Sequence, residues 1–381
     1  MRTLFIVVVC VWIFVSCSQS PSSQQENIIR IENYSIEVTD DHMQIYSGNC
    51  RSVSAFIEGK NCMLAYNNLL HRIDIIDLDN KVPLKHIPLE KEGPDGINGI
   101  SGFAYFDNTI ILQANNGFYQ VNMDGKIVSR CSMEHLLKAF PGFSTMIPDA
   151  QVYFNLYNDL SFDEANGNIA FVIYNLQKEN GEYPKKAIIF SCVDWEIKDV
   201  IDIHYPQNLK KEEKLAMLGR VNVLPHGDSL IYNFPASSDI YIYNRPNKSV
   251  ETYSAEASYT QPLYSYPKGT NELATGYYFP VRYDSRKNTF WRIQQRPVDG
   301  HGIWGKPFSI AQLSSDFKVV NEYVLPAEKF VAPVPLFTDR AILFPYVGGD
   351  HFTESNMVFY GLEYCDNFID YSKALIEKQT R

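Results

Sequence analysis

The sequence contains few cysteines, and none of them is spaced for metal or redox chemistry. Seven cysteines occur in 381 residues, and no C-x-x-C pair is among them, so the usual zinc and dithiol motifs are excluded. In the body of the chain, Cys50 and Cys62 are the one close pair. They either form a bridge or pack as small buried side chains, and burial is favoured.

An excess of positive charge is also absent. The formal net charge is −10 at pH 7, and it becomes −11 when residues 1–16, which include Arg2, are removed. Nucleic acids and anionic lipid surfaces attract proteins with clustered Lys and Arg side chains. We therefore predict no nucleic-acid partner and no attraction to an anionic membrane surface.

Motifs that carry catalysis are missing as well. The chain has no G-x-S-x-G elbow, no H-E-x-x-H pair and no glycine loop of the phosphate-binding or dinucleotide-binding type. Asp74, Asp77 and Asp79 lack the spacing of an EF-hand loop, so Asp79-Asn80 is interpreted as a hairpin turn. The sequence predicts no catalytic residue, no metal site and no cofactor.

Long hydrophobic runs are limited to one segment near the N-terminus. Residues 4–15 form an apolar run of twelve residues between Arg2 and Ser16. A membrane-spanning helix needs roughly 20 apolar residues, so this run has the proportions of a secretory signal peptide. We predict a signal peptide over residues 1–16.

Cys17 directly follows this segment and is the predicted membrane attachment point. Phe14-Val15-Ser16-Cys17 resembles a bacterial lipobox, in which signal peptidase II cuts before a cysteine that carries diacylglycerol. Phe14 and Val15 fit the relaxed lipoboxes of Bacteroidota, and the alternative is an ordinary secretory signal with an incidental cysteine. No acidic cluster follows Cys17. Lipoproteins of that bacterial group that reach the cell surface often carry such a cluster, so this resemblance implies an outer membrane lipoprotein on the periplasmic face, with the cell surface as the alternative.

The residues after Cys17 separate a tether from a folded body. Ser18 to Glu26 is polar, contains a proline and shows no periodicity, which predicts a disordered tether over residues 17–27. The remaining residues, 28–381, contain no internal linker. We predict that they form a single domain.

Strand patterns dominate that domain. Aromatic residues make up 14% of the chain and recur with Val and Ile in short alternating runs, which favours strands. Groups of four runs follow one another at a spacing of about 40 to 55 residues. Met123-Asp124-Gly125-Lys126 supplies the Asp-Gly of a hairpin. The fold is predicted to be all-β: a β-propeller of six four-stranded blades, with seven blades or a β-sandwich assembly as alternatives.

The two ends of the domain predict how the ring closes. The last group, within residues 334–363, supplies only three strands, whereas residues 29–38 form an alternating strand that belongs to no group. Pairing this N-terminal strand with the C-terminal blade removes exposed sheet edges. Short helices are expected at residues 133–140, 208–218 and 368–379.

Two segments add a family resemblance. One is residues 92–99 (EGPDGING), and the other contains Arg282-Tyr283-Asp284 followed by residues 288–292 (NTFWR). Together with the lipobox they resemble uncharacterised six-bladed β-propeller lipoproteins of gut-type Bacteroidota, known only as a domain of unknown function. The resemblance implies architecture and compartment, and it implies no activity.

The stretch from Arg282 to Trp304 is a candidate ligand-binding site. Tryptophan faces stack on sugar rings and arginine grips carboxylates, so an acidic sugar would suit this composition. The alternative is structural: Trp291 packs in the core of its blade and Arg292, on the opposite face, points to solvent. His301 and the pair Asp350-His351 lie in loops of adjacent blades, where they either meet at one end of the ring to hold a metal or are an accidental pair, and the accidental pair is favoured. The candidates are Arg282, Tyr283, Trp291, Arg292, His301, Trp304, Asp350 and His351.

Two classes of function are consistent with these features. The first is a binding or scaffolding module in the cell envelope, whose partner is an envelope protein or a carbohydrate. The second is a glycan-active enzyme or glycan sensor that uses the funnel of the propeller. The missing catalytic motifs favour the first class.

Overall fold

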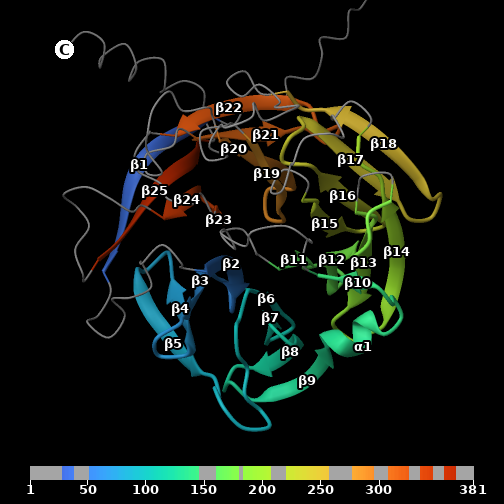
Figure 1. Cartoon of the computed structure of the whole chain (residues 1–381). Helices are drawn as coiled ribbons and strands as arrows, with labels where there is room; N and C mark the ends of the chain where they lie inside the picture. Colours follow the sequence, from blue (N-terminus) through green and yellow to red (C-terminus); the bar gives the residue numbers. More distant parts are fainter. Residues whose placement is uncertain are drawn as a thin grey trace, which may run out of the picture.

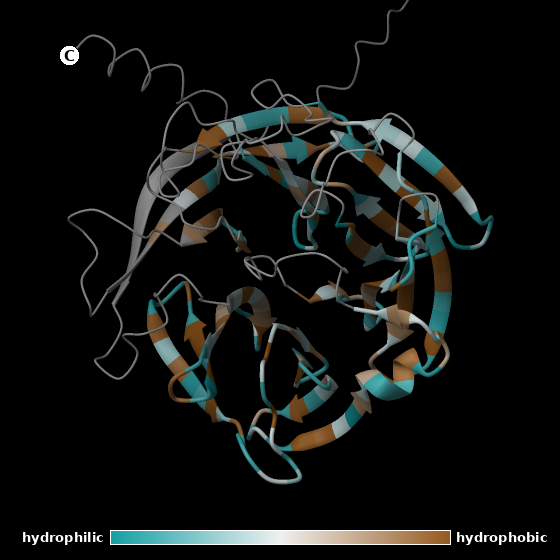
Figure 2. Ribbon diagram, viewed as in Figure 1, coloured by the Kyte–Doolittle hydropathy of each residue, from teal (hydrophilic) through white to brown (hydrophobic). Residues whose placement is uncertain are grey.

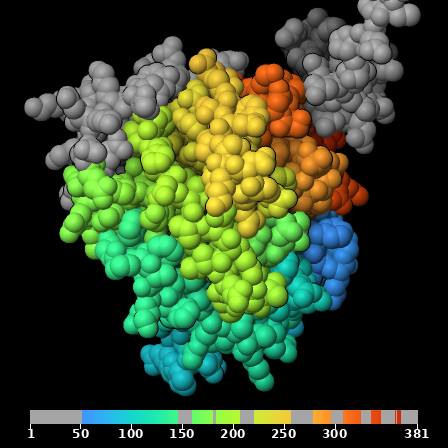
Figure 3. All heavy atoms as spheres, turned by 90° about the vertical axis from the view of Figure 1, so that its right-hand side faces the viewer, coloured from blue at the N-terminus to red at the C-terminus, as the bar shows by residue number. Residues whose placement is uncertain are grey.

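The chain folds into a six-bladed β-propeller (Figure 1). In the computed structural model, short antiparallel sheets surround a common axis, and each sheet forms one blade. The predicted all-β class and the predicted number of blades are confirmed. Figure 3 views the ring from its edge, with blades 3 and 4 in green and yellow toward the viewer. The structure describes residues 28–37, 51–145, 160–179, 183–206, 220–256, 277–295, 308–325, 335–345 and 356–365.

Blades 1 and 2 are meanders of neighbouring strands joined by tight turns. The predicted hairpin after Asn122 forms, with Gly125 at a φ of 81° and its N–H donating to the carbonyl of Asn122 at 3.0 Å. Glycine adopts this left-handed conformation without a steric penalty. The strands are β2 (Arg51–Ile57), β3 (Lys60–Asn67), β4 (Arg72–Asp77) and β5 (Val82–Pro88) in blade 1, and β6 (Gly102–Phe106), β7 (Thr109–Ala114), β8 (Gly117–Asn122) and β9 (Ile127–Ser132) in blade 2.

Blade 3 differs at its inner edge. Two short strands, β10 (Phe143–Ser144) and β11 (Ser161–Asp163), both pair with the same neighbour, β12. Residues 151–157 (QVYFNLY), whose alternating pattern predicts a strand, lie outside the described residues. The other strands are β12 (Asn168–Asn175), β13 (Lys185–Ser191) and β14 (Ile197–Ile203) in blade 3, and β15 (Asn222–His226), β16 (Ser229–Asn233), β17 (Asp239–Asn244) and β18 (Ser249–Ser254) in blade 4.

Blade 6 closes the ring with strands from both ends of the domain. Strand β1 (Ile28–Glu37) pairs antiparallel with β25 (Asn356–Cys365) along its whole length. This confirms the predicted closure. The remaining strands are β19 (Tyr277–Asp284), β20 (Thr289–Gln295), β21 (Phe308–Leu313) and β22 (Val319–Leu325) in blade 5, and β23 (Leu336–Phe337) and β24 (Ala341–Pro345) in blade 6.

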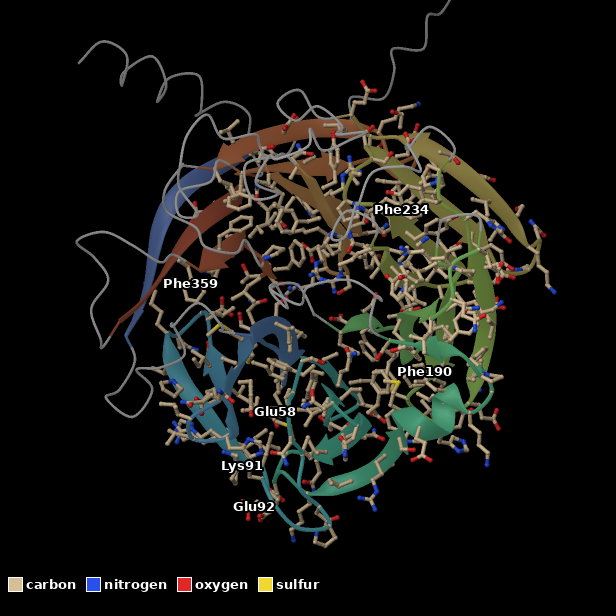
Figure 4. All side chains as sticks on the ribbon, in the orientation of Figure 1. Glu58, Lys91, Glu92, Phe190, Phe234 and Phe359 are labelled. Atoms are coloured by element: carbon tan, nitrogen blue, oxygen red, sulfur yellow. The ribbon has the colours of Figure 1, made fainter. Side chains whose placement is uncertain are left out.

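The hydrophobic core lies between neighbouring blades. Strands such as β3 and β13 are buried at nearly every position, so side chains on both faces of a blade contribute to the core. Figure 2 shows hydrophobic residues along the strands of every blade. Phe190, Phe234 and Phe359 are buried inside blades 3, 4 and 6 (Figure 4). Burial of these large aromatic side chains against the next sheet holds adjacent blades together.

Helix is rare in the described part of the chain. The predicted helix near residue 133 forms as α1 (Met133–Leu137), capped by the Ser132 hydroxyl, which accepts from the N–H of His135 at 3.0 Å. The helices predicted at residues 208–218 and 368–379 lie outside the described residues. Within the described residues, no helix is both long enough and apolar enough to cross a membrane.

Three cysteines are buried free thiols, namely Cys62, Cys131 and Cys192. The favoured prediction for Cys62, packing as a small apolar side chain, is therefore confirmed, and Cys62 forms no bridge. Burial raises the pKa of the Cys62 thiol to about 11, with the nearby charge of Asp77 as a smaller cause.

Candidate functional site

One end of the ring carries the turns that link each innermost strand to the next strand of its blade. We call these the inner turns and this side of the ring the inner-turn end. The turns of blades 3 and 5 have the same construction: Phe162-Asp163 ends β11, and Tyr283-Asp284 ends β19. Each buried aspartate folds its turn by accepting a backbone N–H two residues later, from Ala165 at 3.0 Å and from Arg286 at 3.1 Å.

This construction leaves the residue after each aspartate exposed, namely Glu164 and Ser285. The Ser285 hydroxyl donates to Glu164 Oε2 at 3.1 Å. Glu164 belongs to blade 3 and Ser285 to blade 5, so the hydrogen bond joins two blades that are separated by blade 4. Side chains of non-adjacent blades therefore meet at the centre of the inner-turn end.

Glu164 is exposed, and charged side chains of both signs lie near its carboxyl group. Desolvation by the surrounding protein raises its pKa above the ordinary value, and the negative charges of Asp284 and Asp163 add to this effect. The hydrogen bond from Ser285 and the positive charge of Arg286 act in the opposite direction. Carboxyl groups whose pKa is shifted by desolvation and by specific neighbouring charges cluster at functional sites.

Arg286 connects the same turn to the other side of the ring. Its Nη1 donates to Asn61 Oδ1 of blade 1 at 2.9 Å, and its Nη2 donates to the carbonyl of Phe337 in blade 6. Its Nε lies 3.5 Å from Asp284 Oδ1. The guanidinium is thus engaged by the protein itself, whereas the carboxylate of Glu164 faces solvent.

An aromatic side chain completes the arrangement. Phe56 on β2 pairs with Asn61 on β3, and directly paired residues place their side chains about 5 Å apart on one face of a sheet. The Phe56 side chain is 52% exposed. We define the inner-turn site as Phe56, Asn61, Glu164, Ser285 and Arg286.

Two of the residues that the sequence singled out lie beside this site. Tyr283 directly precedes Asp284, and its ring centroid lies 4.4 Å from that of His226 in blade 4. Its hydroxyl donates to Asn288 Oδ1 at 2.8 Å. Arg282 is half-buried on the same strand. Strands β19 and β20 form an antiparallel hairpin, in which Asp284 pairs with Thr289.

Trp291 and Arg292 lie deep between blades. Trp291 is 1% exposed and packs toward blade 6, with its ring 6.4 Å from Tyr364. Arg292 is 0% exposed, which corrects the expectation that it points to solvent. Alternation does place it on the face opposite Trp291, but that face packs on blade 4, where the guanidinium donates to the carbonyls of Ser238 and Ala255.

The remaining candidates belong to segments that the structure does not describe. Cys17, His301, Trp304, Asp350 and His351 lie outside the described residues, and their roles stay predictions. Among the residues that the structure describes, no group of His, Cys, Asp and Glu side chains is arranged to hold a metal ion.

Sequence reasoning did not find Phe56, Asn61, Glu164, Ser285 or Arg286. One signal was available: an aromatic residue followed by aspartate and a short polar turn occurs as FDEANG from residue 162 and as YDSRKN from residue 283. The repeat marks equivalent turns in two blades. It does not indicate that Glu164 and Ser285 touch, because that contact depends on the closure of the ring.

The fold and this site define a six-bladed β-propeller in which polar side chains from several blades converge at one end of the axis. The chain belongs to the family "Domain of unknown function (DUF4221)", whose model matches residues 32–323. This confirms the predicted family resemblance.

Solved structures agree at the level of the fold. The chain is similar to a DUF4221 family member from Bacteroides vulgatus, with 17% identity, a TM-score of 0.68, and coverage of 90% of this chain and 99% of the other. It is also similar to a putative exported protein from Bacteroides fragilis, with 13% identity, a TM-score of 0.50, and coverage of 88% and 96%. No curated protein matches the chain.

Proposed function

We propose that this protein is an envelope lipoprotein, anchored through Cys17, that binds a ligand at the inner-turn site without catalysis. The observation that carries the proposal is the meeting of Glu164 and Ser285 across blade 4. A contact between blades that are not neighbours costs the ordering of two exposed side chains. Glu164 and Ser285 are exposed, so their contact lies outside the hydrophobic core, which forms between the sheets.

The chemistry of the site indicates the kind of ligand. Glu164 and Ser285 offer oxygen acceptors to solvent, and Arg286 is occupied by Asn61, Phe337 and Asp284. A ligand that donates hydrogen bonds, through hydroxyl or amino groups, therefore fits better than an anion. The exposed ring of Phe56 would pack against the apolar face of such a ligand.

The test is a ligand panel with matched carboxylate variants. The full-length protein is titrated with neutral sugars, amino sugars and acidic sugars, and the melting temperature is recorded. We expect a ligand with hydroxyl or amino donors to raise it, and Glu164→Gln to weaken binding at least about tenfold, the loss expected for a hydrogen bond to a charged group. Glu92→Gln, another exposed glutamate on the loop after blade 1 (Figure 4), should bind like the native protein. Equal binding by Glu164→Gln would contradict the assignment of the site.

The raised pKa of Glu164 favours one second candidate, a glycan-active enzyme. A glycosidase keeps one carboxylic acid protonated as a general acid and places a second carboxylate at a fixed distance from it. Asp163 and Asp284 are the nearby carboxylates, but both are buried and cap their own turns. Release of reducing sugar from any oligosaccharide in the panel, lost in Glu164→Gln, would favour the enzyme over the binding protein.

A further inference from the structure

The direction of β1 shows at which end of the ring the chain enters the fold. Arg30 of β1 pairs with Glu363, which pairs in turn with Ala341 at the start of β24. Ala341 directly follows the inner turn of blade 6, and the N–H of Tyr364 donates to the carbonyl of Arg340 in that turn at 2.8 Å. The first residues of β1 therefore lie at the inner-turn end, and Glu37 lies at the opposite end.

The entry point is directly connected to the site. Tyr364 pairs with Ile29 of β1. Its hydroxyl donates to Asp284 Oδ2 at 2.9 Å, and Asp284 is the residue before Ser285. One side chain thus joins the entry strand to the turn that supplies Ser285 and Arg286.

The length of the tether decides which end of the ring faces the membrane. Residues 18–27 can span at most about 36 Å when fully extended. Strand β1 has ten residues and is about 33 Å long. To turn the opposite end toward the bilayer, the tether would have to run back along the whole of β1, which would use nearly all of its reach. The inner-turn end is the end that an anchor at Cys17 holds against the bilayer.

We propose that the inner-turn site binds the headgroup of a lipid in the membrane that anchors the protein, and that this headgroup donates hydrogen bonds through an ammonium group or sugar hydroxyls. The inference rests on the proposed function above and names its ligand. Glu164 and Ser285 would accept from the donors, and the exposed Phe56 ring would pack against the apolar part of the headgroup. The formal net charge, which is −11 once residues 1–16 with Arg2 are removed, disfavours an anionic headgroup.

Orientation is tested first, independently of binding. A photo-crosslinking amino acid replaces Val193, in the β13–β14 turn at the inner-turn end, or Leu69, in the β3–β4 turn at the opposite end. The two side chains are similarly exposed, at 70% and 62%. In the full-length lipidated protein reconstituted in phosphatidylcholine vesicles, we expect several-fold more lipid crosslinks from position 193. Cys17→Ala should abolish them, and equal crosslinking from position 69 would overturn the orientation.

The headgroup is tested by vesicle composition. Melting temperatures are compared in phosphatidylcholine vesicles and in the same vesicles containing phosphatidylethanolamine or a neutral galactolipid. Phosphatidylcholine has no N–H donor and is the matched control. We expect one donor headgroup to raise the melting temperature by about 2 °C, and this rise to be lost in Glu164→Gln but kept in Glu92→Gln.

The outcomes separate this inference from the proposed function. If no vesicle shifts the melting temperature but a soluble sugar or amine does, the ligand is not a lipid and the binding function stands. If neither vesicles nor soluble ligands act through Glu164, the binding function itself is wrong.

Discussion

The interface between blades 2 and 3 is aromatic, whereas the interface between blades 4 and 5 combines apolar contacts with buried hydrogen bonds. Blades 2 and 3 meet through aromatic rings: the ring centroid of Phe118 in blade 2 lies 4.7 Å from that of Phe190 and 5.7 Å from that of Phe171, both in blade 3. Such a core depends on volume and shape. It tolerates exchange between hydrophobic residues of similar size.

Blades 4 and 5 share an apolar cluster at the inner-turn side and a polar one beyond it. Arg292 donates to Ser238 and Ala255 and lies 4.3 Å from the centre of the Tyr278 ring. Asn233 Nδ2 donates to the carbonyl of Phe279 at 3.2 Å. Burial lowers the pKa of Arg292 to about 10, so it remains charged at neutral pH. This interface depends on specific hydrogen bonds, and it fixes one register between the two blades.

Loss of volume should be most damaging between blades 2 and 3. Phe190→Ala removes a fully buried ring that contacts Phe118, Phe171 and Trp195. We expect it to lower the free energy of unfolding by about 3 to 5 kcal/mol, measured by urea denaturation. Phe190→Leu keeps most of the volume and should cost less than half as much. Equal losses would mean that aromatic geometry, and not volume, holds this interface.

Between blades 4 and 5, loss of hydrogen bonds should destabilise the protein more than loss of side-chain volume. Arg292→Met keeps most of the side-chain length but leaves the carbonyls of Ser238 and Ala255 buried without that donor. We expect a loss of about 2 to 4 kcal/mol, again by urea denaturation. Arg292→Lys keeps the charge and one donor and should lose less. A stable Arg292→Met protein would show that the polar cluster adds nothing beyond its volume.

The contrast also explains what the sequence could predict. Alternation, turn residues and strand count were sufficient for six blades and for closure by β1, because each blade is built largely from local hairpins. Alternation correctly separated Trp291 from Arg292. It assigned Arg292 to solvent because it cannot show which blade covers a strand face.

The inner-turn site was out of reach for a related reason. Glu164 and Ser285 are 121 positions apart, and their turns carry no catalytic or ligand-binding motif. Their contact is a consequence of ring geometry. The turn motif itself is visible in the sequence, but its meaning depends on knowing that blades 3 and 5 flank blade 4 across a closed ring.

The smallest expected effect is on the reactivity of a buried cysteine. This reactivity shows whether the two interfaces open separately. Cys192 is 0% exposed within the aromatic core of blades 2 and 3. Burial raises the pKa of its thiol to about 11, with the charge of Asp194 adding to this. At pH 8 only about one such thiol in a thousand is ionised, and the thiolate is the reactive form. Native Cys192 should therefore resist iodoacetamide, measured by mass spectrometry of its peptide below the melting temperature.

The two destabilised variants turn this thiol into a reporter of local opening. Phe190→Ala loosens the core around Cys192, so alkylation should accelerate, whereas Arg292→Met acts on a distant interface and should leave the rate near the native one. Cys62 in blade 1, whose thiol has a similarly raised pKa, is the internal control and should stay protected in both variants. If both variants accelerate alkylation of Cys192 and Cys62 alike, the ring opens as one unit, and the chemical difference between the interfaces has no effect on their dynamics.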